Sequence, residues 1–454
     1  MEQQEGHEKK YLIDKFVQPV HKFIQQEKSS GIVLGASVLI ALIFANSPLS
    51  ADYFRFFQHK LGFRFDGVSY LEFSIYHWIN DGLMAIFFFV VGLELKREFV
   101  EGELSNLRMA ILPIAAAVGG MLMPALIYHI MNRTGEASNG WGIPMATDIA
   151  FALGVLYLFG KRVPTSIKVF LAALAIVDDL GAVVVIALFY TSKIDIINLT
   201  YGFLFAGTMF IGNKMGVRNL LFYAILGVAG VWAAFVMSGV HATIAAVISA
   251  FTIPADVRIN PRGYINRLNA QLTRLNLIQL NDRSTLSEEQ VHIFDTIKKD
   301  TNAAIPPLQR LEHAFYPIAT FIVLPIFAIA NAGVPFQVHA DLWTGSVALG
   351  VALGLFVGKP LGVIGTTYLL VKLKIAKYPK GMNLQYLMGI GMLASIGFTM
   401  SIFITSLAFD EPAHFVQSKL GIFAASIAGG VLGYFILKKA IRKDGSNNCS
   451  HAET

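Results

Sequence analysis

Residues 167–189 read IKVFLAALAIVDDLGAVVVIALF, an apolar run long enough to cross a membrane, with two adjacent aspartates near its centre. A charge at the centre of a transmembrane helix costs roughly 2.5–3.5 kcal/mol on insertion scales. Asp178 and Asp179 therefore require a function at membrane depth. The pattern predicts a membrane helix whose paired carboxylates serve an ion.

The whole chain has the composition of a polytopic membrane protein. Of its 454 residues, 55% are hydrophobic and only 15% are charged, and the mean hydropathy is +0.57. The single cysteine, Cys449, lies in a polar C-terminal segment, so the sequence offers neither an internal disulfide nor a thiolate metal site. Residues 1–30 lack the apolar core and cleavage site of a signal peptide, so we expect them to remain at the cytoplasmic surface.

Apolar runs of about 20 residues predict an all-α bundle of twelve transmembrane helices. The predicted spans lie at 31–47, 77–95, 109–130, 143–159, 167–190, 196–212, 219–237, 240–253, 315–333, 345–371, 384–408 and 420–437. Most connections between them are short, which favours one compact bundle over separate domains.

The distribution of positive charge predicts the orientation of these spans. The connections assigned to the outside hold only six basic residues, which are Arg55, Lys60, Arg64, Arg133, Lys193 and Lys419. Lys359 lies inside a span, and the other 29 of the 36 Lys and Arg residues fall on the opposite side with both termini. We therefore predict a cytoplasmic N-terminal segment (1–30), transmembrane helices 1–8 (31–253), a cytoplasmic insert (254–311), helices 9–12 (312–437) and a cytoplasmic tail (438–454).

The insert is polar and predicts two amphipathic helices. Asn260 and Pro261 suit the N-cap and first position of one helix, and Ser287 with Gln290 suits a capping box at the start of the other. Both structural packing and regulation are open roles for these helices. No basic stripe with interleaved aromatic residues accompanies them, so membrane lipids, and not nucleic acids, are the expected partners.

Two spans combine helix-breaking residues with polar groups. The fourth contains WGIPMATDIA at 141–150, where Pro144 favours an interruption beside Thr147 and Asp148. The eleventh contains SIGFTMS at 395–401, and its glycines predict further breaks, at Gly389, Gly391 and Gly397. Broken helices in corresponding halves, spans three to five and ten to twelve, indicate a transporter built from inverted repeats.

Broken helices that meet end to end bring like ends of their dipoles together, and these ends need opposite charges. Asp148 suits the positive ends, as electrostatic support or as a direct ligand of an ion. Lys359, in FVGKPLG at 356–362, suits the negative ends or a carboxylate, since it lies too deep in its span to reach the interface.

The same groups predict the chemistry of transport. Sodium and lithium are hard cations that prefer oxygen ligands, which Asp178, Asp179, Thr147 and the free carbonyls of broken helices can supply. Because burial disfavours the charged form of a carboxylate, a proton competes with the cation for the same oxygens. A site that opens to one side at a time would then exchange the two without ATP or a covalent step.

Eight strings in the same order make the chain closely resemble the bacterial NhaA-type sodium/proton antiporters along almost its whole length, apart from the insert. These strings are WINDGLMA (78–85), VGLELKRE (91–98), ATDIAFALG (146–154), AIVDDLGA (175–182), SGVHAT (238–243), FAIANAGV (327–334), GKPLG (358–362) and IGFTMSIFI (396–404). The resemblance implies twelve helices with inverted-topology repeats and two crossed, interrupted helices, in a homodimer in the bacterial inner membrane.

The resemblance also implies roles for individual residues. Asp179 becomes the main carboxylate for cation and proton, Asp178 its partner, and Lys359 the group that pairs with Asp178. Thr147 and Asp148 belong to the crossed assembly. The implied function is electrogenic, pH-regulated export of sodium or lithium in exchange for protons, with no cofactor.

A pH response is implied for five further residues, which are Glu94, Glu98, Glu312, His313 and His241. Where the family often has a second histidine and a basic residue, this chain has Tyr316 and Gln309, and its insert is longer. The alternative function is a sodium-coupled solute symporter, which would take up solute without releasing protons. An intramembrane aspartyl protease is not expected. The two carboxylates of such a protease lie on separate helices, whereas Asp178 and Asp179 are adjacent in this chain.

Overall fold

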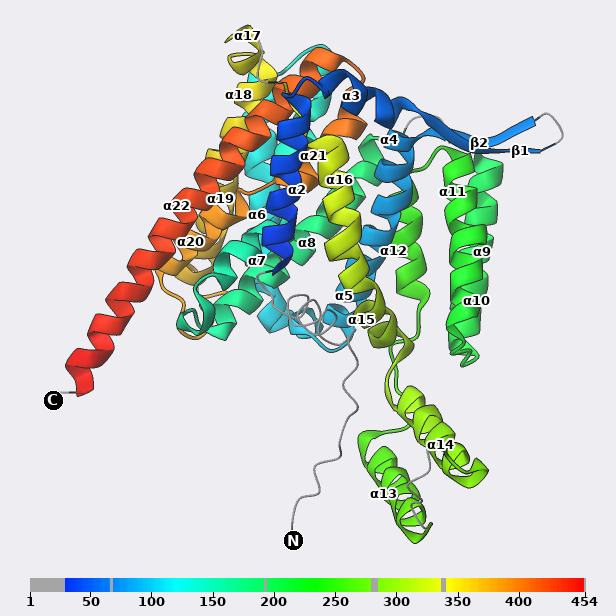
Figure 1. The fold of residues 1–454 in the computed structure, drawn as a ribbon. Coiled ribbons are helices and arrows are strands. Elements are labelled where there is room, and N and C mark those ends of the chain that lie inside the picture. The colour runs from blue at the N-terminus through cyan, green and yellow to red at the C-terminus, as the bar shows by residue number, and fades with distance from the viewer. Residues whose placement is uncertain (1–28, 66–67, 192–193, 279–284, 336–339, 453–454) are drawn as a thin grey trace. The chain divides into compact units, whose positions relative to one another are not determined.

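The computed structural model describes residues 29–65, 68–191, 194–278, 285–335 and 340–452, and these are mostly helical (Figure 1). Nearly all of the predicted N-terminal segment and the last two residues of the predicted tail lie outside this description. Contacts divide the chain into two compact units. The first unit combines Met1–Phe87, Asn106–Tyr190 and Pro317–Thr454, and the second combines Phe88–Ser105 with Thr191–Tyr316.

The first unit contains most of the long helices. Its elements are α2 (Ser29–Ala45), α3 (Ser50–Gln58), β1 (Lys60–Phe65), β2 (Val68–Ser74), α4 (Ile75–His77), η1 (Trp78–Leu83), α6 (Leu107–Met131), η3 (Glu136–Met145), α7 (Ile149–Tyr157), η4 (Gly160–Arg162), α8 (Thr165–Phe189), η6 (Ala319–Val323), α16 (Leu324–Asn331), α17 (Ala340–Trp343), α18 (Ser346–Leu353), η7 (Gly354–Gly358), α19 (Lys359–Lys372), α20 (Leu384–Ala394), α21 (Phe398–Ala408) and α22 (Pro412–Ala452).

The second unit contains η2 (Glu103–Ser105), α9 (Ile196–Lys214), α10 (Leu220–Ile225), η5 (Leu226–Trp232), α11 (Ala233–Ser238), α12 (Ala242–Thr252), α13 (Pro261–Leu277) and α14 (Glu288–Ala304). Helices α5 (Met84–Val100) and α15 (Pro307–Ile318) cross the boundary between the units. The two helices predicted for the insert are confirmed as α13 and α14, and Ser287 and Gln290 form the predicted capping box.

Nine helices in the described part of the chain are long and apolar enough to cross a membrane, or up to eleven if two bent pairs each count as one span. The bent pairs are α2 with α3, at 111°, and α20 with α21, at 42°. The sequence predicts twelve spans. One of these, 240–253, corresponds to α12, whose 11 residues measure about 16 Å at about 1.5 Å per residue. That length is about half of a bilayer's hydrocarbon thickness. The chain is a multi-pass membrane protein.

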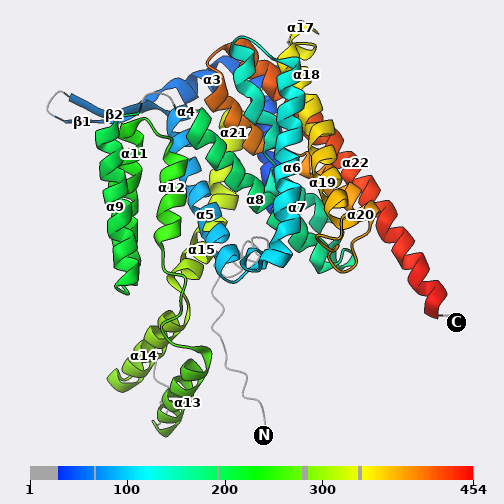
Figure 2. The same cartoon turned by 180° about the vertical axis from the view of Figure 1, so that it is seen from behind.

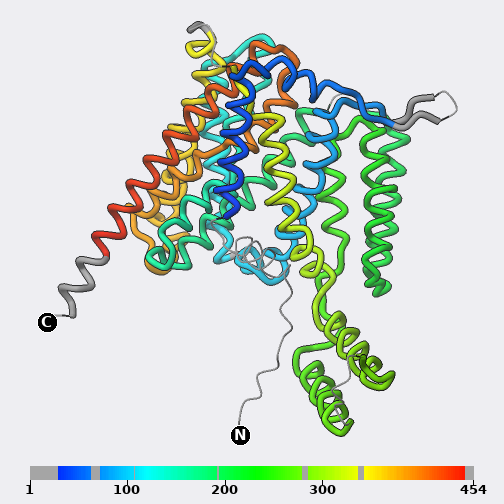
Figure 3. The backbone as a smooth tube through the Cα atoms, in the orientation of Figure 1, coloured from blue at the N-terminus to red at the C-terminus, as the bar shows by residue number. Residues whose placement is uncertain are grey.

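Two of the long segments are interrupted; Figure 3 traces the backbone from which both arise, coloured by residue number. Residues 146–148 separate the 3₁₀ helix η3 from α7, which confirms the predicted break at Thr147 and Asp148. Residues 395–397 separate α20 from α21, so the break predicted at Gly397 is also confirmed.

The breaks predicted at Gly389 and Gly391 are wrong, because both residues lie inside α20. A Cβ atom at Gly389 would stand 2.6 Å from the side chain of Leu437 in α22, and one at Gly391 would stand 2.8 Å from Ile364 in α19. These glycines let neighbouring helices approach α20 closely. Their absence of a side chain serves packing and does not interrupt the helix.

A two-stranded antiparallel hairpin of β1 and β2 precedes the second long helix (Figure 1). Lys60 pairs with Ser74 and Phe65 with Val68, and the register shifts between Leu61 and Phe63. The sequence analysis did not predict this hairpin, because it reads the stretch only as a connection between spans.

Candidate functional site

The paired aspartates lie in the middle of α8, inside the first unit. Asp178 is 1% exposed and Asp179 is 2% exposed. Helix α8 packs against α6 and α7, and these helices lie together in both views of the fold (Figures 1 and 2). The two carboxylates are therefore removed from solvent, which makes charged or hydrogen-bonding partners obligatory.

Lys359 supplies a cation for this carboxylate pair. Its Nζ lies 2.5 Å from Asp178 Oδ2, with both side chains fully buried, and it also donates a hydrogen bond to the carbonyl of Met145. Asp179 contributes to the electrostatic environment of the same lysine. Lys359 lies between two irregularities of its span. The π-helical turn η7 ends just before Lys359, and Pro360, which has no amide hydrogen, follows Lys359.

Close contact between α6 and α19 fixes the position of Lys359. A Cβ atom at Gly362 would stand 2.0 Å from the carbonyl oxygen of Gly119, so only glycine fits there. A Cβ atom at Gly120 would stand 3.7 Å from Lys359 Cε and 2.8 Å from Val363. The backbones of the two helices are thus nearly in contact, and the lysine side chain extends along the surface of α6 toward α8.

Asp148 lies where the two breaks meet and caps the beginning of both following helices. Its Oδ1 accepts a hydrogen bond of 3.1 Å from the amide of Phe151 in α7. Its Oδ2 accepts one of 3.0 Å from the amide of Thr399 and one of 2.5 Å from the Thr399 hydroxyl, in the first turn of α21. One carboxylate therefore faces two helix N-termini, where a negative charge is most favourable.

Hydrogen bonds join the two breaks directly. The amide of Asp148 donates to the carbonyl of Ile396 at 2.6 Å, and the hydroxyl of Thr147 donates to the carbonyl of Ala394 at 2.9 Å. From the other side, the hydroxyl of Ser401 donates to the carbonyl of Ile143 at 2.8 Å. These bonds satisfy one amide and three carbonyls of the two broken segments across the crossing, as a membrane interior favours.

The first unit therefore brings together the five residues that the sequence analysis placed in the ion site. Lys359 bonds to Asp178 and to the carbonyl of Met145 at the end of η3. Thr147 is a neighbour of the Asp178 carboxylate. Asp148 accepts hydrogen bonds from the N-terminal ends of α7 and α21. Carboxylate, hydroxyl and carbonyl oxygens gather here, which is the ligand chemistry of a hard monovalent cation.

The sequence analysis missed Thr399 and Ser401 as individual site residues. Both belong to the quoted string at 395–401, and both side chains are buried, at 1% and 0% exposure. The sequence could have indicated them by their position, because both lie within about one helical turn after the predicted break at Gly397. Only the structure shows that they bond to the other broken helix and not to their own.

A second cluster of charges lies in the second unit. Arg97 contacts Glu312 at 2.6 Å and Glu98 at 3.1 Å, and Glu94 belongs to the same electrostatic group. His313 is exposed and adjoins Glu312. The structure thus brings together four of the five residues assigned to a pH response, with Arg97 as a cation that the sequence analysis did not single out.

His241, the fifth of these residues, is not part of the cluster. It immediately precedes α12, whereas Lys96 of the neighbouring α5 donates hydrogen bonds to the carbonyls of Phe251 and Ile253 at the other end of that helix. The two ends of α12 are about 16 Å apart for its 11 residues. His241 therefore lies a helix length away from the glutamates.

Comparison with known proteins agrees with these features. The model of the family described as Na+/H+ antiporter 1 matches residues 21–437. The chain is 46% identical over 432 residues to the Na(+)/H(+) antiporter NhaA of Oleidesulfovibrio alaskensis, covering 95% of this chain and 96% of the relative. It is also 46% identical over 417 residues to the Na(+)/H(+) antiporter NhaA of Wolinella succinogenes, covering 91% and 92% respectively.

The fold was also compared with solved structures. The sodium proton antiporter MjNhaP1 from Methanocaldococcus jannaschii at pH 8 aligns with a TM-score of 0.45 and 13% identity, over 94% of this chain and 99% of that one.

Proposed function

The chain belongs to the Na+/H+ antiporter 1 family, and from this membership we propose how its buried site exchanges sodium for protons. It is a membrane-embedded transporter and not an enzyme. Sodium ions and protons are its substrates, and it needs no cofactor. The proposal concerns the residues that carry these substrates, the direction of exchange and its control.

Asp179 and Asp178 bind either sodium or protons, with Thr147 and carbonyls of the broken helices as further oxygen ligands. A sodium ion in the site satisfies the carboxylates in their charged form. When sodium leaves, a buried carboxylate is stabilised by taking up a proton. Because the two occupants exclude each other, each passage of sodium in one direction requires passage of protons in the other.

Lys359 adds a second proton-linked event. With Asp178 ionised, the ammonium group neutralises it at 2.5 Å. Sodium at the same carboxylate competes with the ammonium, which favours loss of the lysine proton because two cations cannot share one buried carboxylate without cost. Two proton-linked groups per sodium ion make the exchange electrogenic, so an inward proton gradient can export sodium or lithium against its own gradient.

Asp148 keeps the crossing intact during exchange. Its charge compensates the N-terminal ends of α7 and α21 at once. Small movements of the two broken helices then change access to the aspartates without leaving a helix end unpaired in the membrane. We assign Asp148 to this supporting role and not to direct contact with sodium, because three donors already occupy its carboxylate oxygens.

The observation that carries this proposal is the fully buried pair of Lys359 and Asp178 beside the crossing of two broken helices. The test is proton flux in everted membrane vesicles, followed with a pH-sensitive dye, on adding sodium, lithium or potassium over a pH series. We expect sodium-dependent and lithium-dependent proton release by the wild type and none by Asp179→Asn. Sodium-driven uptake of a solute without proton release would instead support the symporter alternative.

We further propose twelve spans with inverted repeats and both termini at the cytoplasmic face of the bacterial inner membrane. The biased distribution of Lys and Arg and the paired broken helices support this topology. It places the insert and the cluster around Arg97 on the cytoplasmic side. Cysteine labelling from either side, at Ser287 and at Ser138, tests this topology, since the two positions should react from opposite sides.

The cluster around Arg97 supports regulation by pH. Three glutamates share one arginine, so their protonation changes the balance of charge in the cluster. We propose that this balance sets the cytoplasmic pH at which exchange begins.

The β1–β2 hairpin supports a homodimer. In the described residues it has only two strands, so each strand has one edge that can pair with a second copy. The mass of the purified protein in detergent, compared with that of a variant lacking the hairpin, tests this assembly.

A further inference from the structure

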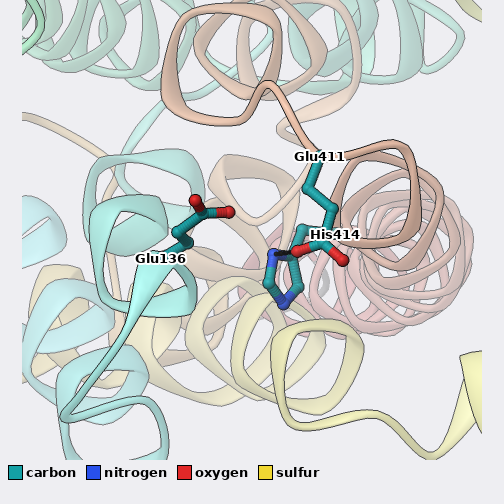
Figure 4. Close-up of side chains that lie close together, drawn as sticks. All are labelled: Glu136, Glu411 and His414. Carbon is teal, nitrogen blue, oxygen red and sulfur yellow. Dashed lines mark ion pairs between the residues drawn. The ribbon is translucent and has the colours of Figure 1, made fainter.

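Three metal-ligating side chains gather away from the ion site, at Glu136, Glu411 and His414 (Figure 4). One ligand atom from each lies within 4.8 Å of the others. They come from segments far apart in the sequence, since Glu136 begins η3, whereas Glu411 immediately precedes α22 and His414 lies in its first turn.

The histidine nitrogen in this cluster lacks a hydrogen bond. His414 Nδ1 stands 2.8 Å from Glu411 Oε2 in an ion-pair contact, and this buried atom makes no hydrogen bond among the described residues. A buried polar atom without a partner calls for an explanation. A close contact without a hydrogen bond is expected of two ligand atoms that converge on a shared ion.

The scaffold around the cluster is already assembled. The His414 ring packs against Phe409, with ring centroids 5.3 Å apart. A Cβ atom at Gly140 in η3 would stand 2.5 Å from that same phenylalanine ring. Packing thus holds the histidine next to η3, while the Glu411 side chain is 48% exposed and leaves a path for an ion from solvent.

We propose that Glu136, Glu411 and His414 bind a divalent transition-metal ion such as Zn²⁺. One imidazole nitrogen and two carboxylates are typical ligands of zinc, and water completes the four-coordinate shell of an open site. Ligand atoms about 2.1 Å from a tetrahedral zinc are about 3.4 Å apart. Side-chain movements of about an ångström therefore close the observed cluster, and the ion neutralises both glutamates.

Binding here joins the ends of the two broken spans. Glu136 lies in the segment that leads to Thr147 and Asp148, and Glu411 follows α21, which carries Thr399. A bound ion would restrain η3 against the link between α21 and α22. This consequence rests on the proposed function, in which the broken helices move during exchange, and it predicts that Zn²⁺ slows transport.

The first experiment measures Zn²⁺ binding to tag-free, full-length protein in detergent by calorimetry. We expect one site per chain, weakened at least tenfold in His414→Ala and in Glu136→Gln. His129→Ala is the matched control, since His129 is an exposed histidine in the last turn of α6, and its affinity should equal that of the wild type. Equal affinity in all four proteins, or no binding by the wild type, would overturn the site.

The second experiment adds Zn²⁺ to proteoliposomes and measures sodium-driven proton flux. Slower exchange in the wild type but unchanged exchange in His414→Ala supports the restraint. Binding without slowing retains the site and overturns the restraint. Failure of the proposed function would appear separately, as absence of exchange in metal-free wild-type protein.

Discussion

Removing the cation from the buried pair should destabilise the protein more than any surface change. In Lys359→Met, Asp178 loses a partner at 2.5 Å while both side chains are fully buried. Breaking a buried ion pair in this way costs about 3–5 kcal/mol, because one uncompensated charge remains. Unfolding entropy of roughly 2.1 cal/mol/K per residue gives about 1 kcal/mol/K for a chain of this length. The expected fall in melting temperature is therefore about 3–5 °C.

The assay is thermal unfolding in detergent followed by intrinsic fluorescence, with a double-mutant cycle. Asp178→Asn alone leaves the lysine unpaired and should also destabilise the protein. The double variant contains no buried charge in this pair, so it should be more stable than the sum of the single effects predicts. Lys372→Met, an exposed lysine in the last turn of the same helix, should remain within about 0.5 kcal/mol of the wild type. Additive effects in the double variant would refute the pairing.

Three further predictions follow from single contacts. Thr399→Val removes the hydroxyl that bonds Asp148 at 2.5 Å, and thermal unfolding should show a loss of about 1–3 kcal/mol. Gly362→Ala forces a Cβ atom against the backbone of α6, so proton flux in vesicles should fall strongly even where the protein inserts normally. Glu312→Gln removes one carboxylate that competes for Arg97, so Arg97 stabilises the charged form of its other carboxylates more strongly. The activating pH should fall by about one to two units, because a charge-assisted hydrogen bond of about 1.5–3 kcal/mol corresponds to roughly that shift. A series of dye measurements over pH checks this, and an unchanged profile would contradict it.

The class of the protein and the burial of its paired aspartates could be predicted from sequence because the cost of charge in a membrane is so high. Asp178, Asp179 and Lys359 stand out in apolar runs, and a proline among small residues marks the break at Thr147. Such signals are local in the chain. They need no knowledge of which helices are neighbours.

The remaining features depend on contacts between distant segments. Gly389 and Gly391 look like helix breakers in the sequence, yet they lie inside α20 and serve close packing against α22 and α19. Thr399 becomes part of the site only because α21 begins next to Asp148. The approach of Glu136 to His414 and Glu411 likewise cannot be seen before η3 and α22 are brought together.

Competition between sodium and protons at Asp178 and Asp179 is tested most directly by sodium binding to purified protein over a pH series, with proton release recorded in the same calorimetric titration. Wild-type protein should release protons as sodium binds. For each proton displaced, its apparent Kd for sodium should rise by up to about tenfold for each unit by which the pH falls. Asp179→Asn should show neither effect. Sodium binding by the wild type with a Kd that is independent of pH and without proton release would contradict exchange through shared carboxylates.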